Sequence, residues 1–509
     1  MVADLKNREI KKLLILGGGT AGCLAAAALA RQLNPDYYQV TVLDSSYIDG
    51  IGVGESVLPS FVSFLHSLGL DEQDFIQKTG ASIKLGIQFR NWLGNEDSFF
   101  HHLGGLGCDL NGHNFFDCWL KARSGGDLTP LRDYAPAAVM ADEQRFDFPS
   151  GFPPDSPLSG ADHALHVDAG LVCRYLRDFA EQRQVRFIKA HVVRVNRGES
   201  GCIESLELNN REIVAADFFI DCSGLRSLLV GEVLNSSFEE WNHFLPCDRA
   251  VTMQTPVHDV IPPFSVSTTK QSGWTWRIPL QQRISSGYVF SSKFSSDQQA
   301  MRVLRDSVHG EPMQEPHFIP FKNGLREQFW KKNCIALGLA GGFLEPLEST
   351  AIHLAIRGLE NMLELFPNLE EGQCEWPALA EEYNRRMRVD YEEIRDFILL
   401  HYNTTQRTDT EFWRHCQSLP VTDTLASRLE LFRARAVLQV SEGRLFKASN
   451  WLAVFTGMGV QPRNRNPFLD MTGFDATHLA MQTYRANLKA AVQQLPTYEK
   501  FLNTTRAAS

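Results

Sequence analysis

Three glycines near the N-terminus, Gly17, Gly19 and Gly22, have the spacing G-x-G-x-x-G. They follow an apolar run at residues 13–16 and precede an alanine-rich stretch, so the pattern predicts a strand, a tight turn and a helix. Glycines in such a turn let a pyrophosphate approach the backbone, and the start of the helix faces the phosphates. Asp44, at the end of the next predicted strand, is suited to binding a ribose. Together these residues predict a site for FAD or NAD, with a ligand-free glycine turn as the alternative.

Polar residues also gather where a later helix begins, in the segment FLEPLESTAIHLAIRG at 343–358. Glu345, Glu348 and Thr350 stand just ahead of an apolar-periodic run, which predicts a helix that begins near Leu347. Acids and hydroxyls at this position stabilise the partly positive end of a helix. The segment alone leaves open whether they also do chemistry.

A lysine and two tryptophans lie on predicted strands. Trp274 and Trp276 alternate in SGWTWRIPL and therefore share one strand face, as residues of a protein core commonly do. Lys84, in ASIKLGIQFRNW, lies on the face opposite Leu85, and Gly86 thins that face enough to admit a ligand. A solvated lysine is the alternative for Lys84.

The remaining elements predict an α/β fold. The segment ADFFIDCSGLRS at 216–227 reads as a strand ending in Asp-x-Ser-Gly, which is common in two-domain FAD enzymes where the chain returns to the nucleotide fold; an ordinary strand and turn is the alternative. Asp168 caps a predicted helix. Residues 245–295 are β-rich, and the chain is mostly helical from about residue 370. We therefore expect an FAD-binding domain interleaved with a β-rich substrate region at 1–365, and a helical region that completes the substrate pocket at 366–509.

Composition excludes several classes of function. The 509 residues are 43% hydrophobic and 22% charged, as in ordinary globular proteins. The net charge of −10 argues against binding to nucleic acid or to an anionic membrane. The ten cysteines are scattered without C-x-x-C or zinc-finger spacing, so we expect no metal site and a reducing, cytoplasmic location.

Five motifs occur in order along the chain. They are the glycine turn, GVGES at 52–56, Lys84 ahead of NW, the W-x-W-x-I-P of Trp274 to Pro279, and FLEPLESTAI. Together they resemble the flavin-dependent halogenases of the tryptophan-halogenase family, from residue 11 to about residue 460. The resemblance implies an FAD-binding Rossmann-like fold of the hydroxylase type.

The resemblance also implies a reaction. The family uses reduced FAD, oxygen and a halide (chloride or bromide) to make hypohalous acid, which travels through a tunnel to a lysine near an aromatic substrate. Here that lysine is Lys84, and the family's essential glutamate matches Glu348, which can accept the proton lost from the ring. The halide site matches the backbone amides of Thr350 and Ala351.

Other roles follow from the same match. Trp274 and Trp276 wall the tunnel and keep the substrate from the flavin. Related aromatic hydroxylases carry Gly-Asp where this chain has Gly338 and Leu339, which favours halogenation over hydroxylation. The residues expected to contact FAD are Gly17, Gly19, Thr20, Ala21, Gly22, Asp44, Gly54, Val192, Leu339 and Ile352.

The substrate is less well defined by the sequence. Residues 430–470 lack the adjacent tyrosines with which free-tryptophan enzymes of the family hold their substrate. Trp451 and Phe455 are expected either to stack on a substrate ring or to form helix core. We expect an indole or another electron-rich aromatic, with free or peptide-bound tryptophan, a hydroxylase and a non-catalytic flavoprotein as alternatives. Without a second nucleotide site, a separate NAD(P)H-dependent flavin reductase is the expected partner.

Overall fold

The computed structural model describes residues 10–45, 54–94, 96–110, 112–258, 260–369, 373–471 and 474–506. The chain divides into two compact units, each built from three segments. The nucleotide-binding unit contains residues 1–79, 167–242 and 321–394, and the β-rich unit contains residues 80–166, 243–320 and 395–509. Residues 366–394 thus group with the first unit, whereas the later helices group with the β-rich segments, and helix α9 (Pro377–Asn403) contributes residues to both.

A six-stranded sheet forms the centre of the nucleotide-binding unit. Its order is β20-β21-β12-β1-β2-β8, and all strands except the edge strand β20 run parallel to their neighbours. This confirms the predicted α/β fold. The continuous apolar runs in the sequence of these strands are typical of parallel strands buried on both faces. The strands are β1 (Lys11–Leu16), β2 (Tyr38–Asp44), β8 (Arg186–Lys189), β12 (Phe218–Asp221), β20 (Trp330–Lys331) and β21 (Cys334–Ala336).

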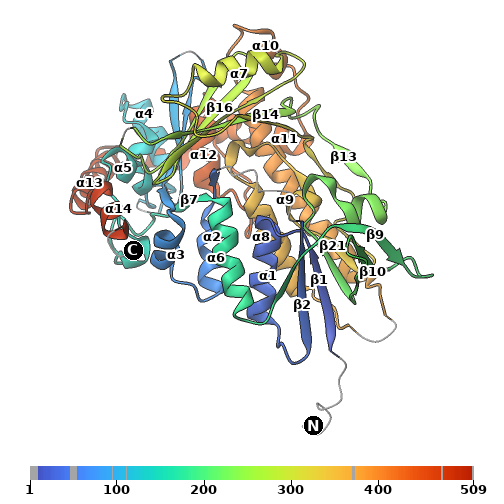
Figure 1. Cartoon of the computed structure of the whole chain (residues 1–509). Helices are drawn as coiled ribbons and strands as arrows, with labels where there is room; N and C mark the ends of the chain where they lie inside the picture. Colours follow the sequence, from blue (N-terminus) through green and yellow to red (C-terminus); the bar gives the residue numbers. More distant parts are fainter. Residues whose placement is uncertain are drawn as a thin grey trace. The chain divides into compact units, whose positions relative to one another are not determined.

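Both faces of this sheet are covered. Helix α1 packs against α6 and α8 (Figure 1). A three-stranded antiparallel sheet, in the order β11-β10-β9, contributes Ile203, Leu206 and Leu208 to one apolar cluster with Leu14 and Phe219. The covering elements are α1 (Thr20–Gln32), α6 (Ala169–Glu181), α8 (Ala351–Glu364), β9 (Val192–Arg197), β10 (Ile203–Leu208) and β11 (Ile213–Ala215).

Shorter elements complete the nucleotide-binding unit. Asp168 caps α6 as predicted, since its Oδ1 accepts a hydrogen bond from Leu171 N at 2.9 Å. The remaining elements are β3 (Gly54–Ser56), α2 (Pro59–Ser67), α3 (Glu72–Thr79), β13 (Phe238–Glu240), β19 (Gly324–Arg326), β22 (Gly342–Phe343), and the short helical turns η3 (Gly224–Arg226), η4 (Leu228–Val233), η5 (Gly338–Ala340) and η6 (Pro346–Glu348).

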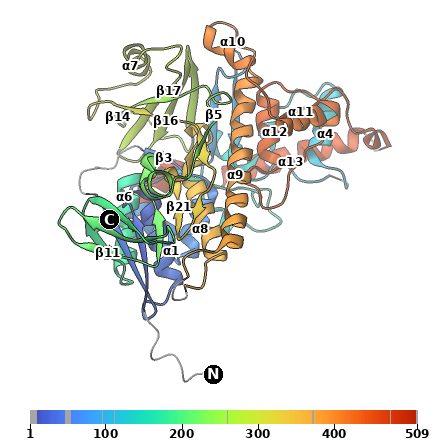
Figure 2. The ribbon, with the colours of Figure 1, turned by 90° about the vertical axis from the view of Figure 1, so that its right-hand side faces the viewer.

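The β-rich unit is built on a seven-stranded sheet. Its order is β18-β14-β17-β16-β15-β5-β6, and only the pair β15–β5 is parallel among its described strands. Figure 2 shows β14, β17 and β16 side by side. The strands are β5 (Gly86–Arg90), β6 (Ser98–His102), β14 (Arg249–Pro256), β15 (Ser265–Lys270), β16 (Gly273–Pro279), β17 (Arg283–Phe290) and β18 (His317–Pro320).

Other elements of this unit surround the sheet. The expected single strand around Lys84 is interrupted at Leu85, whose N–H donates to Pro263 O, so that β4 pairs with β7 instead. The elements are β4 (Ser82–Lys84), β7 (Ala164–Asp168), α4 (Phe115–Ser124), η1 (Leu131–Tyr134), α5 (Pro136–Asp142), η2 (Pro149–Gly151), α7 (Asp297–Arg305), α10 (Glu411–Gln417), α11 (Asp423–Arg435), α12 (Ala448–Gly457), η7 (Pro467–Met471), α13 (Phe474–Gln493) and α14 (Tyr498–Arg506).

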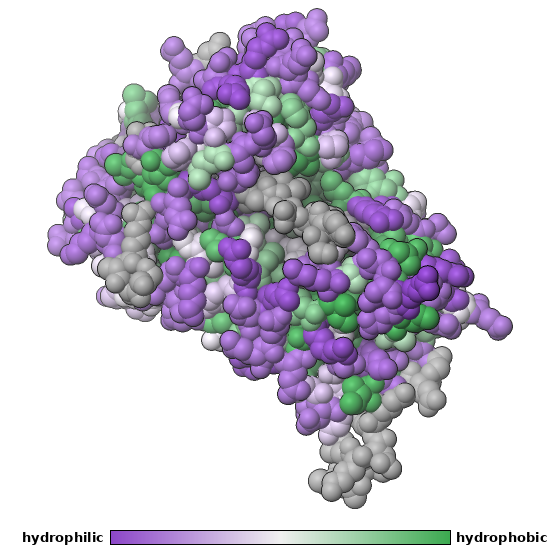
Figure 3. All heavy atoms as spheres, in the orientation of Figure 1, coloured by the Kyte–Doolittle hydropathy of each residue, from purple (hydrophilic) through white to green (hydrophobic). Residues whose placement is uncertain are grey.

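Within the described part of the chain, no helix combines the length and the apolar character that crossing a bilayer requires. The uncharged run at residues 13–30 resolves into β1, the glycine turn and α1. On the face drawn in Figure 3, apolar residues form small groups among hydrophilic ones.

Candidate active site

The glycine turn has the shape that a dinucleotide requires. Gly17 has φ of 114°, and a Cβ on it would lie 2.2 Å from Cys222 O. A Cβ on Gly22 would lie 1.8 Å from Gly17 O, so this position needs glycine for packing. A Cβ on Gly19, in contrast, would meet no atom within 4 Å. Packing therefore requires glycine at positions 17 and 22, whereas Gly19 borders open space that a phosphate group could occupy.

The end of β2 completes this turn. The Asp44 carboxylate lies so close to the backbone that a Cβ on Gly18 would be 2.4 Å from Asp44 Cγ. Helix α1 begins at Thr20, and its N-cap residue Gly19 offers no capping side chain. The start of α1 thus keeps its N–H groups available beside a carboxylate, which fits a diphosphate and a ribose.

A second segment expected at the cofactor adjoins the same turn. Gly338, in η5, has φ of 61°, and a Cβ on it would lie 2.7 Å from Ala21 Cβ. The next residue, Leu339, is 37% exposed although it is apolar. Ile352 lies in the first turn of α8, which packs against both α1 and η5. The structure therefore brings Ala21, Leu339 and α8 into one region of the nucleotide-binding unit.

Two other expected cofactor contacts also belong to that unit, and one of them, Val192, packs against the apolar cluster that contains Leu16 and Leu43. Val192 begins β9, and Gly54 is buried at the start of β3. Gly52 and Val53, from the motif GVGES, lie outside the described residues.

The residues expected to act as catalytic glutamate and halide site lie around the start of α8. The helix begins at Ala351 and not near Leu347 as the sequence predicts, because η6 ends at Glu348 and Ser349 adopts φ of 62°. Glu348 is buried, with 1% of its surface exposed. Thr350, the N-cap residue, makes no side-chain cap, and its buried Oγ1 has no hydrogen-bond partner among the described residues.

The backbone at this helix start has spare donors. Within the described chain, no carbonyl accepts from the N–H of Thr350 or Ala351. The Thr350 side chain therefore does not cap the helix, which was the structural alternative for this segment. Two amides and a hydroxyl at the positive end of a helix instead suit a small anion.

Lys84 is fully buried in the β-rich unit, which excludes the solvated alternative. It ends β4 and is paired with Ala164 of β7. The space above Gly86 is filled: a Cβ there would lie 2.5 Å from Phe100 Cε1, so Gly86 admits a protein ring and not a ligand, contrary to expectation.

The two tryptophans of W-x-W-x-I-P have different surroundings. Trp274 is buried, with its ring 6.4 Å from that of Trp92, so it belongs to the core of the β-rich unit. Trp276 is partly exposed, and its ring lies over Gly287, where a Cβ would be 2.1 Å from the indole. Its Nε1 has no hydrogen-bond partner in the described chain.

Comparison with known proteins identifies the family. The model of the tryptophan halogenase family matches residues 12–473. The chain belongs to the tryptophan halogenase family. This halogenase is 31% identical to the tryptophan 7-halogenase RebH of Lentzea aerocolonigenes, over 97% of this chain and 98% of that protein. Among solved structures, it resembles BrvH, a flavin-dependent halogenase from Brevundimonas sp. BAL3, with 38% identity, a TM-score of 0.93 and coverage of 98% and 100%. It resembles Xcc4156, a flavin-dependent halogenase from Xanthomonas campestris, with 37% identity, a TM-score of 0.93 and coverage of 98% and 99%.

These matches confirm that the protein is a flavin-dependent halogenase with an FAD-binding Rossmann-like fold. The candidate site residues of this halogenase fall in both units: the flavin, glutamate and halide residues in the nucleotide-binding unit, and Lys84 with the aromatic residues in the β-rich unit.

Trp451 and Phe455 of this halogenase match the core alternative. Both are fully buried in α12. The Trp451 ring lies 4.8 Å from that of Phe397 and 3.9 Å from the guanidinium of Arg428, and Phe455 lies 4.4 Å from Phe432. A role for the two residues in binding substrate stays a prediction.

Several buried histidines were not anticipated from the sequence. His166 lies between Ser82 and Ser265 in the β-rich unit. His102, in β6, has no hydrogen-bond partner in the described chain for either ring nitrogen, and burial lowers its pKa to about 3. His353, in α8, bonds Ser60 Oγ at 2.8 Å, and burial lowers its pKa to about 3 as well. The only sequence signal is a histidine within an apolar stretch, which says nothing about its partners.

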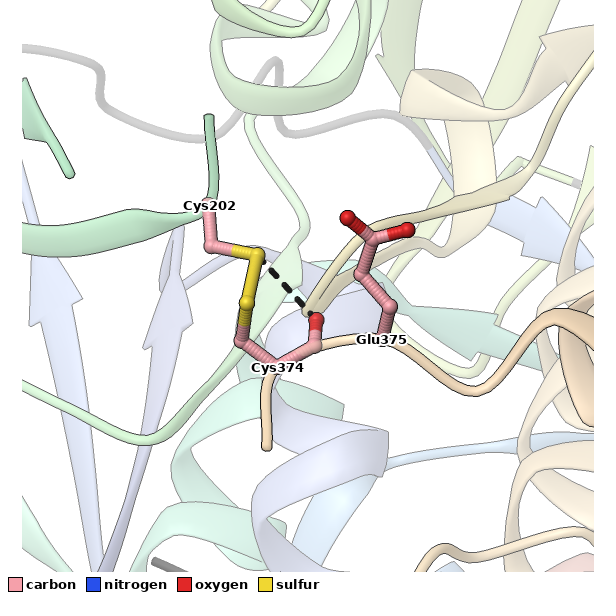
Figure 4. A group of neighbouring side chains, drawn as sticks. All are labelled: Cys202, Cys374 and Glu375. Atoms are coloured by element: carbon pink, nitrogen blue, oxygen red, sulfur yellow. Dashed lines mark hydrogen bonds between the residues drawn. A yellow bond between two sulfur atoms is a disulfide. The ribbon is translucent and has the colours of Figure 1, made fainter. Parts of the chain in front are cut away.

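The halogenase also contains a disulfide that the scattered cysteines did not suggest. Cys202, just before β10, is bonded to Cys374, which lies 172 residues later between α8 and α9. Glu375 stands beside the pair (Figure 4) and forms an ion pair with Lys332. Such a bond has no local signature, because its two cysteines meet only in the folded unit.

Proposed function

We propose that this halogenase uses FADH2, oxygen and a halide to halogenate an electron-rich, indole-type ring. The enzyme class is that of its family, whereas the substrate, the halide and the residue roles are proposals. The relatives are named for tryptophan, and free or peptide-bound tryptophan remains the alternative substrate. Because the sequence offers one dinucleotide fingerprint, a separate flavin reductase supplies the reduced cofactor.

The nucleotide-binding unit holds the cofactor and the halide. The open space at Gly19 accommodates the diphosphate, and Asp44 binds the ribose. Reduced FAD, when bound, supplies with oxygen the oxidising power that turns halide into hypohalous acid. The N–H groups of Thr350 and Ala351, with the Thr350 hydroxyl, hold the halide at the positive end of α8.

Lys84 directs the oxidant. As an ammonium it donates a hydrogen bond to hypohalous acid and polarises the halogen; as an amine it forms a haloamine. Either form delivers electrophilic halogen to the ring. Its complete burial supports this role, because water would otherwise compete for the oxidant.

Glu348 accepts the proton that the ring loses on substitution. Its burial at the end of η6 keeps the carboxylate away from bulk water. A positioned carboxylate in such surroundings is a suitable general base. The partly exposed Trp276 is proposed to wall the path of the oxidant, and the absence of the hydroxylase Gly-Asp pair at Gly338 and Leu339 supports halogenation over hydroxylation.

The observation that carries this proposal is the burial of Lys84 in a member of a flavin-dependent halogenase family. To test it, the protein is mixed with FAD, NADH, a flavin reductase and bromide, and offered a panel of indoles and phenols. A bromine isotope doublet in the product mass supports the proposal. A product heavier by one oxygen would identify a hydroxylase, and flavin binding without any turnover would identify a non-catalytic flavoprotein.

A further inference from the structure

A hydrogen-bonded histidine lies beside Lys84. His166 and Ser82 are directly paired across β7 and β4, so their side chains point to the same side of the strand pair. Lys84 is two residues beyond Ser82 and therefore shares that side. All three side chains are fully buried. The imidazole is thus the diagonal neighbour of the Lys84 side chain.

The bonds of this histidine define a consistent set of donors and acceptors. Ser82 Oγ donates to Pro279 O at 2.5 Å. Because the hydroxyl hydrogen of Ser82 is used in that bond, Ser82 Oγ accepts from Nδ1–H of His166, at 3.1 Å. Nε2 of His166, 2.9 Å from Ser265 Oγ, is left to accept from that hydroxyl. We assign the neutral Nδ1–H tautomer from this network.

The network joins four strands around Lys84. Ser82 belongs to β4, His166 to β7, Ser265 to β15, and Pro279 ends the W-x-W-x-I-P strand β16. The imidazole of His166 is neutral: burial lowers its pKa well below the ordinary value and the charge of Lys84 lowers it further, while a hydrogen bond with the Pro279 backbone opposes the shift. A neutral imidazole fixes the strand without placing a second cation beside the amine.

We propose that His166 is a positioning residue for Lys84: together with Ser82 it fixes the strand that carries the amine against the end of the W-x-W-x-I-P strand. This inference rests on the proposed role of Lys84. Loss of the His166 side chain should lower the fraction of oxidant that reaches the ring, because an amine displaced by about 1 Å no longer delivers halogen efficiently.

The test measures ring halogenation per reduced flavin oxidised, together with hypohalous acid captured by a diketone trap. His166→Phe keeps an aromatic ring and removes both hydrogen bonds, and Ser82→Ala removes the bridge to Pro279 in a variant that changes one atom. Both should lower the ratio of ring product to oxidised flavin at least tenfold, raise trapped hypohalous acid and leave FAD affinity unchanged. His166→Gln, which can restore one hydrogen bond, should recover part of the ratio.

His401→Phe is the matched control, because His401 is equally buried in the same unit and lies among Phe89, Trp92 and Phe397. It should reduce thermal stability and leave the ratio unchanged. If His166→Phe and Ser82→Ala lose stability but keep the wild-type ratio, the histidine is only structural and the inference is overturned. If Lys84→Ala itself keeps the wild-type ratio, the proposed function fails first, so the two failures are distinguishable.

Discussion

Asn323 Oδ1 accepts a hydrogen bond of 2.8 Å from the backbone N–H of Glu345, and the Asn323 side chain is fully buried. Asn323 is itself fixed, since its N–H donates to Asn242 Oδ1 at 3.0 Å and its carbonyl accepts from Trp241 N at 2.8 Å. The turn that carries Glu348 and leads to Thr350 is therefore held at its start by one amide side chain.

Asn323→Ala should weaken both the fold and the halide site. A buried N–H that loses its acceptor costs about 1–3 kcal/mol of stability. We also expect the KM for bromide to rise, because the backbone donors at Thr350 and Ala351 follow the same turn. Thermal unfolding and bromide-dependent product formation measure the two effects.

Asn384→Ala is the control for that variant. Asn384 makes two hydrogen bonds in the same unit: its Oδ1 accepts from Trp330 N at 2.8 Å, and its Nδ2 donates to Trp330 O at 3.0 Å. It should lower stability comparably and leave the KM for bromide unchanged. Equal KM values in the two variants would argue against any link between Asn323 and halide binding.

The glycines of the cofactor turn should respond differently to alanine. Gly19 has φ of −74° and open space around its Cβ, so Gly19→Ala should fold normally. It should nevertheless weaken FAD binding at least tenfold, or about 1.4 kcal/mol, because the methyl group occupies the approach of the diphosphate. Gly22→Ala should fail to fold well, since its Cβ would overlap Gly17 O.

Gly151→Ala provides the comparison for Gly19→Ala, because Gly151 also has no atom near its Cβ and lies in the β-rich unit. It should bind FAD as the wild type does. Isothermal titration with FAD measures both variants, and wild-type affinity in Gly19→Ala would mean that the diphosphate lies elsewhere.

The disulfide should stabilise the nucleotide-binding unit. Closing a loop of 172 residues restricts the unfolded chain, and removal of such a bond typically costs about 2–5 kcal/mol. We expect dithiothreitol to lower the melting temperature of the wild type but not that of the double variant Cys202→Ser, Cys374→Ser. Thiol titration of the denatured, unreduced protein should find eight free thiols among the ten cysteines; ten would contradict the bond.

His102 should make the protein sensitive to acid. Burial, followed by the charges of His101 and Arg132, lowers its pKa from 6.5 to about 3. The unfolded chain takes up a proton below pH 6.5 while the folded chain does not, so stability present above pH 6.5 is lost as the pH falls toward 3. One such histidine lowers the free energy of unfolding by about 2 kcal/mol as the pH falls from 6.5 to 5.

His102→Leu should remove the part of the acid-induced loss of stability that is due to His102. Urea unfolding at pH 8 and pH 5 gives the free energy of unfolding at each pH, and the difference between the two values should be smaller in the variant. His309→Leu, at an exposed position, should leave the difference as in the wild type. Equal pH differences in His102→Leu and the wild type would show that His102 becomes protonated inside the fold.

The sequence was sufficient for the features that depend on local pattern. The strand, turn and helix around Gly17, Gly19 and Gly22 follow from apolar periodicity and from glycine conformation, and the family assignment follows from motifs in order. The start of α8 was misplaced because a serine at positive φ, Ser349, interrupts the helix without any sequence signal.

Features that depend on distant pairing could not be predicted. The alternation around Lys84 shows only that it lies opposite Leu85; whether that face is solvated depends on β7, and the contact of Ser82 with His166 spans 84 residues. For the same reason Gly86 was expected to admit a ligand, whereas Phe100 from the neighbouring strand fills its space. Burial of Trp451 and Phe455 likewise depends on helices that pack only in the folded unit.

The central claim is that oxidant made at the flavin is used at Lys84. Lys84→Met keeps an unbranched side chain that is one atom shorter and removes the amine, and Lys121→Met does the same to another buried lysine of the β-rich unit, which donates to Leu469 O. The measurement is ring-halogenated product and trapped hypohalous acid per reduced flavin oxidised, in the presence of bromide and an indole. Lys84→Met should oxidise flavin normally, release free hypohalous acid and lose ring product at least a hundredfold, while Lys121→Met keeps the wild-type ratio. Ring halogenation by Lys84→Met at the wild-type ratio would contradict the account.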